Sequence, residues 1–241
     1  LTGTLDYRGN STPTFLNTNL AGNPGIRENV TYDTLTATIT GAGQPLDVIA
    51  NGSTLTLAGL STQSGDVDIE LQNGSLNVTG PITAGQVLSP YQNINLSAVD
   101  GGITGSGLIR GNIATFTANS SSSVATDVRT LAANITGANQ SFAVAETNAL
   151  VLEAGDAIVT NGGAIGVTVA VGDLTGTGNI TTGGSVGNIT LTAAKAVLPT
   201  GTITGGLLTV NAGDGSAIPF ANISGLAANI TGPNDTLSVT D

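Results

Sequence analysis

Cysteine, histidine, methionine and tryptophan are all missing from the 241 residues of this chain. Without cysteine, the fold can use neither disulfides nor thiolate metal sites, and no redox compartment can be inferred. Without histidine and cysteine, the chain lacks the commonest general base, the thiol nucleophile and the usual transition-metal ligands. Catalysis by a Ser-His-Asp triad is therefore excluded, and we expect neither an enzyme nor a bound cofactor.

Positive charge is also scarce, with five Lys and Arg against sixteen Asp and Glu and a formal net charge of −11. Binding of nucleic acid needs clustered Lys and Arg that neutralise phosphates. We therefore expect no nucleic-acid partner and no attraction to anionic membranes. The acidity favours the solubility of an exposed protein.

Long apolar runs are missing too, since no stretch approaches the roughly 20 residues that a membrane helix needs. No basic segment followed by an apolar one marks an export signal. We expect no membrane insertion. The sequence begins at Leu1 and has no methionine, so we expect a piece of a longer precursor whose targeting segment lies elsewhere.

The residues that are present favour β-structure. Helix-favouring Lys, Arg, Glu, Gln and Met are scarce, whereas β-branched residues are abundant. Disordered chains are poor in apolar residues, but here 39% of the residues are hydrophobic and they recur in short alternating runs. The composition therefore predicts a folded, all-β protein.

The sequence also repeats. The heptapeptide Leu-Ala-Ala-Asn-Ile-Thr-Gly occurs at residues 131–137 and again at 226–232, a displacement of 95 residues, or five times 19. Alternating apolar pairs mark the intermediate steps, which are all close to this length, and we expect these pairs to face inwards and form the core. These markers are Leu35/Ala37, Leu55/Leu57, Leu76/Val78, Ile94/Leu96, Leu131/Ala133, Leu150/Leu152, Val169/Val171, Ile189/Leu191, Leu208/Val210 and Leu226/Ala228, with Ile113 as a weaker marker for which Ala114/Phe116 is the alternative.

A unit of about 19 residues with Gly-rich corners cannot bury its own apolar face, so successive units must stack. Propeller blades need a period of about 40 residues or more, and antiparallel sandwiches do not keep such a register. The sequence predicts a right-handed parallel β-helix, a solenoid with coils of about 19 residues. Residues 1–34 would form irregular N-terminal coils, and residues 35–241 a regular shaft of about eleven coils.

Two strand-like runs, Asn-Ile-Asn-Leu-Ser-Ala at 93–98 and Asn-Ile-Thr-Leu-Thr-Ala at 188–193, and the Gly-Gly turns before Ile103 and Val186 carry a family resemblance. They resemble the repeats of filamentous haemagglutinin and high-molecular-weight adhesins, which bacteria export by two-partner secretion. The resemblance covers roughly residues 35–240. The secretion module of that family is not recognisable in residues 1–34.

The resemblance implies export through an outer-membrane partner, a rod-like shaft, and roles in attachment, aggregation or biofilm matrix. We expect a non-catalytic structural or adhesive segment of a bacterial fibre, located at the cell surface or outside the cell. Its expected partners are cell-surface or matrix components and further copies of itself, joined end to end or laterally.

One close set of carboxylates stands out. Asp66, Asp68 and Glu70 are spaced so that all three lie on one face of a strand. Carboxylate oxygens suit calcium, so these residues are weak candidates for half of a metal site. Because Val67 and Ile69 would face the core, the stronger interpretation is the solvated side of an amphipathic strand, and we predict no metal site.

Asn-x-Ser/Thr sequons are frequent, with fourteen in the chain. Eight have Val, Ile or Leu in the middle, so outward–inward–outward alternation produces the pattern without any glycan. The same alternation points each Asn outwards, as a glycan requires. The candidate acceptors are Asn77, Asn95, Asn134, Asn179, Asn188, Asn222 and Asn229.

Two other function classes stay open. A carbohydrate-active β-helix enzyme would use paired carboxylates, and the missing bases argue against it. An ice-binding β-helix is suggested by the alternating threonines at 34–40 and 54–56. It would need threonine pairs in register on successive coils, and Asn77, Asn95 and Asn134 interrupt that register.

Overall fold

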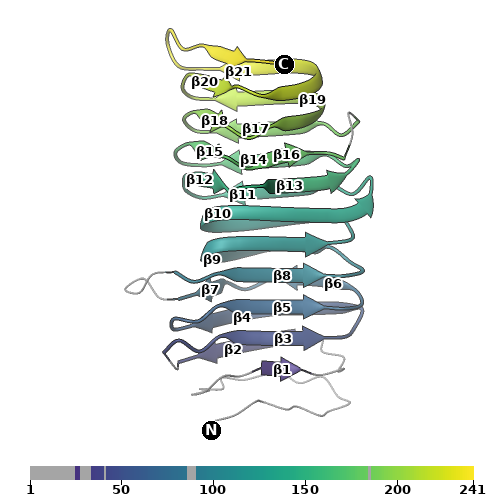
Figure 1. Cartoon of the computed structure of the whole chain (residues 1–241). Coiled ribbons are helices and arrows are strands. Elements are labelled where there is room, and N and C mark those ends of the chain that lie inside the picture. The colour runs from purple at the N-terminus through teal and green to yellow at the C-terminus, as the bar shows by residue number, and fades with distance from the viewer. Residues whose placement is uncertain (1–24, 28–33, 41, 86–90, 184–185) are drawn as a thin grey trace. The chain divides into compact units, whose positions relative to one another are not determined.

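A computed structural model (Figure 1) describes residues 25–27, 34–40, 42–85, 91–183 and 186–241. Within these residues all regular structure is β and no helix occurs. The strands pair in parallel and stack as a β-solenoid of about nine turns with a spacing of roughly 21 residues. The predicted all-β solenoid is thereby confirmed. Of the predicted irregular coils at 1–34, only 25–27 and Thr34 belong to the described residues.

The chain divides into two compact units, Leu1–Asn119 (unit 1) and Ser120–Asp241 (unit 2). The strands of unit 1 are β1 (Gly25–Arg27), β2 (Thr34–Ile39), β3 (Leu46–Ala50), β4 (Thr54–Thr62), β5 (Val67–Leu71), β6 (Ser75–Val78), β7 (Ile82–Ala84), β8 (Ile94–Ala98) and β9 (Ile103–Ala118).

Three columns of parallel strands make up unit 1. Face A contains β1, β3, β5, β8 and the end of β9. Face B contains the starts of β2, β4 and β9 together with β6. Face C contains the ends of β2 and β4, then β7 and the middle of β9. Each coil therefore pairs only with the coil before it and the coil after it.

Unit 2 repeats this plan. Its strands are β10 (Ser122–Ala138), β11 (Phe142–Glu146), β12 (Leu150–Leu152), β13 (Asp156–Asn161), β14 (Ile165–Val169), β15 (Leu174–Gly176), β16 (Asn179–Thr181), β17 (Ile189–Ala193), β18 (Val197–Pro199), β19 (Ile203–Ala212), β20 (Ser216–Ile218), β21 (Ala221–Ile230) and β22 (Leu237–Val239).

The three faces of unit 2 follow from the pairing. Its face A joins the start of β10 to β11, β14, β17 and the ends of β19 and β21. Its face B joins the middle of β10 to β12, β15 and β18, next to the β20–β22 pair. Its face C joins the end of β10 to β13, β16 and the starts of β19 and β21.

The core is made of inward-facing aliphatic ladders. In β17, for example, Ile189, Leu191 and Ala193 are buried while Thr190 is exposed, as strand alternation requires. Ile189 stacks on Ile165 of β14, and Leu208 of β19 stacks on Ile189. Each such fully buried aliphatic side chain contributes about 1.5–3 kcal/mol relative to exposure.

The spacing between coils, roughly 21 residues, is longer than the predicted length of about 19 and less regular than the sequence predicted. Ile189 pairs with Leu208 at the expected spacing, whereas Val67 pairs with Ile94 across a distinctly longer coil. The predicted equivalence of Leu131 and Leu150 is wrong, because Leu131 pairs with Leu152. In the longer coil, β7 ends at Ala84 and β8 begins only at Ile94.

The irregular corners also correct two marker positions. Val169 is buried in β14, but Val171 lies in the following corner with an exposed fraction of 59%, so it is not an inward residue. Ala114 and Phe116 pair with Ile94 and Leu96 and are buried. They, and not Ile113, hold the inward positions.

The two identical heptapeptides lie on different faces of unit 2. In the first copy, Leu131 pairs with Leu152 on face B and Ala133 with Ile158 on face C. In the second, Leu226 pairs with Leu208 on face A. The displacement between the two copies is therefore not a whole number of coils, although their alternation suits either face.

A buried threonine closes the same corner in both units. Thr62 Oγ1 donates a hydrogen bond to the carbonyl oxygen of Gly65, and Thr160 Oγ1 donates one to Gly163 at 2.6 Å. A Cβ on Gly163 would lie 1.9 Å from the carbonyl oxygen of Gln140 in the preceding coil. The corner from face C to face A therefore requires glycine for close backbone approach.

Candidate functional site

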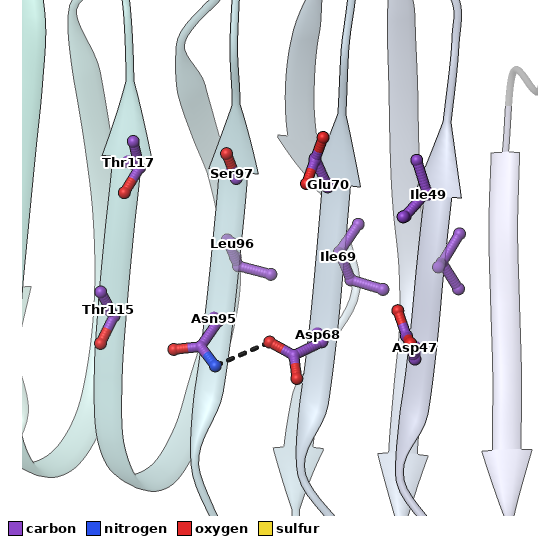
Figure 2. A pocket seen from close by; sticks show the side chains of 11 residues that line it. Asp47, Ile49, Asp68, Ile69, Glu70, Asn95, Leu96, Ser97, Thr115 and Thr117 are labelled. Carbon is purple, nitrogen blue, oxygen red and sulfur yellow. Dashed lines mark hydrogen bonds between the residues drawn. The ribbon is translucent and has the colours of Figure 1, made fainter. Parts of the chain in front are cut away.

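Face A of unit 1 carries a shallow depression of about 380 Å³ (Figure 2). Two outward rows line it, because residues at i and i+2 of a strand share a face and parallel pairing keeps neighbouring coils in register. The first row is Asp47, Asp68, Asn95 and Thr115, and the second is Ile49, Glu70, Ser97 and Thr117. Neighbouring side chains in a row are about 4.8 Å apart along the stack.

The acidic end of the depression is partly compensated. Asp68 Oδ1 accepts a hydrogen bond from Asn95 Nδ2 at 2.7 Å (Figure 2). Asp47 is the register neighbour of Asp68 on its other side, so two carboxylates stand one coil apart. Glu70 Oε1 has a long contact of 3.5 Å with Gln72 Nε2. This face presents carboxylates, an amide and hydroxyls to solvent.

The three weak metal candidates are not brought together. Asp68 and Glu70 lie on β5, but Asp66 precedes it and its Oδ1 accepts the backbone N–H of Asn93 at 2.8 Å. Asp66 therefore caps a corner. In the described part of the chain, no group of three Asp, Glu, His or Cys side chains is placed to hold a metal ion.

The sequon asparagines fall into two groups. Three of them bond to neighbouring coils. Asn95 donates to Asp68, and Asn188 Oδ1 accepts from the backbone N–H of Leu207. Asn179 bonds to the coils on both sides: its Nδ2 donates to Asp156, and its Oδ1 accepts the backbone N–H of Thr202. Asn134, Asn222 and Asn229 are exposed, and Asn77 is half-buried beside Thr56. Exposed Asn134 on β10 is thus a better-placed acceptor than Asn179.

Glu146 at the end of β11 is a residue that sequence reasoning missed. It faces inwards and is only 1% exposed. Its Oε2 accepts the backbone N–H of Val128 at 3.1 Å, and its Oε1 accepts that of Asn148 at 3.0 Å. The alternation of the run 142–146 could have indicated this position, because Glu146 follows inward-facing Phe142 and Val144 at every second residue.

Burial raises the pKa of the Glu146 carboxyl, while the Asn148 amide, the Thr126 hydroxyl and the Val128 amide lower it. Thr126 is the register partner of Glu146 and fully buried. Its hydroxyl is near enough to act on the carboxylate, but it forms no hydrogen bond of acceptable geometry. A buried carboxyl group and a buried unpaired hydroxyl thus face each other inside unit 2.

In the ranges that the structure describes, no helix is long and apolar enough to cross a membrane. No family model, no curated protein and no solved structure matches the chain. The relation to filamentous haemagglutinin stays a prediction from the repeat motifs.

Proposed function

We propose that this chain is a non-catalytic structural or adhesive segment of an extracellular fibre. The observation that carries the proposal is the difference between the inward and the outward side chains of the strands in both units. Most inward positions hold aliphatic side chains, whereas many outward positions hold small polar ones in register. On face A of unit 2, one such row is Thr168, Thr192, Asn211 and Asn229. Such a surface offers many similar hydrogen-bonding groups along one face.

A surface of this kind favours adhesion through repeated weak contacts. Outward groups recur about every 4.8 Å along a column, so a polymeric partner with a repeating polar structure meets several of them at once. Linked weak contacts raise the overall avidity far above the affinity of each contact. Cell-surface and matrix polymers are therefore the partners that we propose. The resemblance of the repeats to exported adhesins is what supports export through an outer-membrane partner.

Self-association is part of the same proposal. β21 pairs with β19 along one edge. On its other edge, the backbone N–H groups of Ala221 and Ile223 donate to Thr240 and Asp241, and no described strand pairs with the rest of β21. Unpaired backbone N–H and C=O groups on a strand edge are a template for a further strand. Leu226 and Phe220, in or just before β21, have exposed fractions of 48% and 58%.

The test is binding of the full chain to bacterial cells and to isolated matrix polymers. A variant with Thr192→Lys and Asn211→Lys places two long charged side chains in the polar row of face A of unit 2. We expect it to bind several-fold less than the parent while keeping its circular dichroism spectrum. Asn134→Lys, on face C, is the matched control. Equal binding by the parent and the Thr192/Asn211 variant would contradict adhesion through this row.

A carbohydrate-active enzyme is the second candidate, and the depression on face A of unit 1 is the observation that favours it. Glycosidases use two carboxyl groups that flank the scissile bond, and Asp47, Asp68 and Glu70 line one hollow. Reducing-end release from polysaccharides by the parent chain, lost in Asp68→Asn and in Glu70→Gln, would favour the enzyme over the fibre.

Ice binding has no such support. Thr56 pairs with Asn77, and the threonine column of Thr190 and Thr209 on face A of unit 2 continues into Ala227. The described residues thus offer no extended array of threonine pairs in register.

A further inference from the structure

Several polar contacts join the corner after β11 to the preceding coil. The backbone N–H of Thr147 donates to the carbonyl oxygen of Thr126 at 2.9 Å, and Thr147 Oγ1 donates to the same oxygen at 3.0 Å. Asn148 Nδ2 donates to Asp127 Oδ1 at 2.8 Å. Glu146 adds its bond from the Val128 amide and lies beneath these contacts, in the interior. The corner is therefore built around a buried carboxyl group.

The surroundings of this carboxyl group offer little compensation for a negative charge. β14 packs on β11 and has no ionisable residue, and neither do β12 and the corner residues 147–149. β10 carries Asp127 and Arg129, and the charge of Asp127 repels that of Glu146. Two backbone amides are the hydrogen-bond donors to its oxygens. Removing a carboxylate from water costs more than such donors return unless a cation pairs with it.

The Thr126 hydroxyl gives the charged form only partial help. It is buried and is the register neighbour of Glu146 one coil earlier. It is near enough to lower the pKa of the Glu146 carboxyl, as a hydroxyl that donates to a carboxylate does, but it is not placed with the geometry of a hydrogen bond.

We propose that Glu146 is a proton-binding site that stabilises the β11 corner of unit 2 against β10. In the step, the carboxylate takes up one proton from solvent and becomes a neutral carboxyl group, so one buried charge disappears. The amide bonds from Val128 and Asn148 anchor the same group in both states.

The direction of the pH effect follows from linkage. Because burial raises the pKa of Glu146, folded unit 2 holds this proton at pH values where the unfolded chain has released it. The contribution to stability is greatest below the ordinary pKa of 4.5. It falls as the pH rises from there to the folded-state pKa and is lost above it. Unit 2 is thus held more firmly in mild acid than at neutral pH.

Carbon-13 NMR of the full chain labelled in glutamate carboxyl groups tests the site directly. The sequence has only four glutamates, Glu28, Glu70, Glu146 and Glu153. We expect one resonance to titrate at a higher pH than the other three and to vanish in Glu146→Gln. Each unit of displacement corresponds to about a tenfold tighter hold on the proton. Four overlapping midpoints would overturn the proposal.

Two further variants test the surroundings of the carboxyl group, and neither depends on Glu146→Gln being folded. Thr126→Val removes, at similar volume, the hydroxyl that favours the charged form, so the Glu146 midpoint should rise. Thr126→Ser keeps a hydroxyl and should preserve the midpoint. An unchanged or lower midpoint in Thr126→Val would mean that Glu146 does not face Thr126 inside the coil, and the buried proton site would be wrong. In thermal unfolding, Glu153→Gln is the control for loss of one half-exposed carboxylate, and it should retain the acid stabilisation of the parent.

Discussion

Asn95 donates a hydrogen bond from Nδ2 to Oδ1 of Asp68, its register neighbour one coil earlier, at 2.7 Å. The pair lies on the outward side of face A of unit 1, so both groups also have access to water. Asparagine at position 68 would still offer an oxygen to Asn95. We therefore expect Asp68→Asn to change the free energy of unfolding by less than about 1 kcal/mol.

Urea denaturation with and without calcium measures this. We expect the same midpoint in both, because Asp66 is engaged with the Asn93 amide and does not join Asp68 and Glu70. A calcium-dependent rise in the midpoint of the parent chain, absent from Asp68→Asn, would show that these carboxylates bind the metal after all.

Leu152→Asp should destabilise unit 2 by several kcal/mol, because it puts an unpaired carboxylate into an apolar ladder. Leu152 is 1% exposed and stacks on Leu131. Val171→Asp is the matched control, since Val171 is 59% exposed in a corner. Chemical denaturation of the two variants should separate them clearly, and similar losses would contradict the observed register.

Gly163→Ala should be far more damaging than Gly166→Ala, although the two glycines are close in the sequence. A Cβ at 163 would lie 1.9 Å from the Gln140 carbonyl oxygen, whereas one at 166 meets its nearest atom, Ala143 Cβ, at 3.9 Å. Backbone must move in the first case and nothing need move in the second. Thermal melts of both variants check this, and a mild effect of Gly163→Ala would mean that the coils can separate at this corner.

Thr160→Val should cost about 1–3 kcal/mol, because it removes the bond to Gly163 and leaves a buried carbonyl oxygen without that donor. Thr190→Val makes the same chemical change at an exposed position of β17. We expect it to be nearly neutral. Equilibrium unfolding of both variants in urea provides the measurement. Equal losses of unfolding free energy would mean that the strand propensity of the new residue, and not the hydrogen bond to Gly163, causes the effect.

Asn134 should accept a glycan more readily than Asn179 when the chain is produced in a host that modifies sequons. Asn134 is exposed, whereas the amide of Asn179 is bonded to Asp156 and Thr202 in the coils on either side. Peptide mass spectrometry measures the occupancy of each site. Higher occupancy at Asn179 would show that its cross-coil bonds open easily.

Asn179→Ala should also destabilise unit 2 more than Asn134→Ala.

Alternating apolar runs that recur about every 19 residues were enough to predict the solenoid, because a coil of that length buries its apolar side chains only by stacking on its neighbours. They could not predict the register, since the corners vary in length and only a three-dimensional arrangement shows which ladders meet. Val171 was therefore placed inside although it lies in a corner. The depression on unit 1 could not be predicted for the same reason. Asp47 and Asp68 are distant in the sequence, and only the pairing of β3 with β5 makes them neighbours.

Glu146 escaped prediction for a different reason. Strand alternation places Glu146 on the inward side, but a carboxylate is normally excluded from an apolar ladder. Its acceptance depends on amides from β10 and from its own corner. Such donors are contributed by backbone, which has no signature in the amino-acid sequence.

The heptapeptide shared by face A and faces B and C of unit 2 bears on how such chains evolve. A segment copied by slippage or recombination need not be inserted a whole number of coils away from its source. It is enough that its apolar residues face inwards and its polar residues face outwards at the new position. Coils can then exchange sequence between faces without loss of folding, and sites on one face can drift while the stack persists. Two segments that look like homologous repeats in an alignment need not occupy equivalent positions. A phylogeny of individual coils in this kind of protein is therefore sounder when the coils are matched by ladder position than by sequence identity.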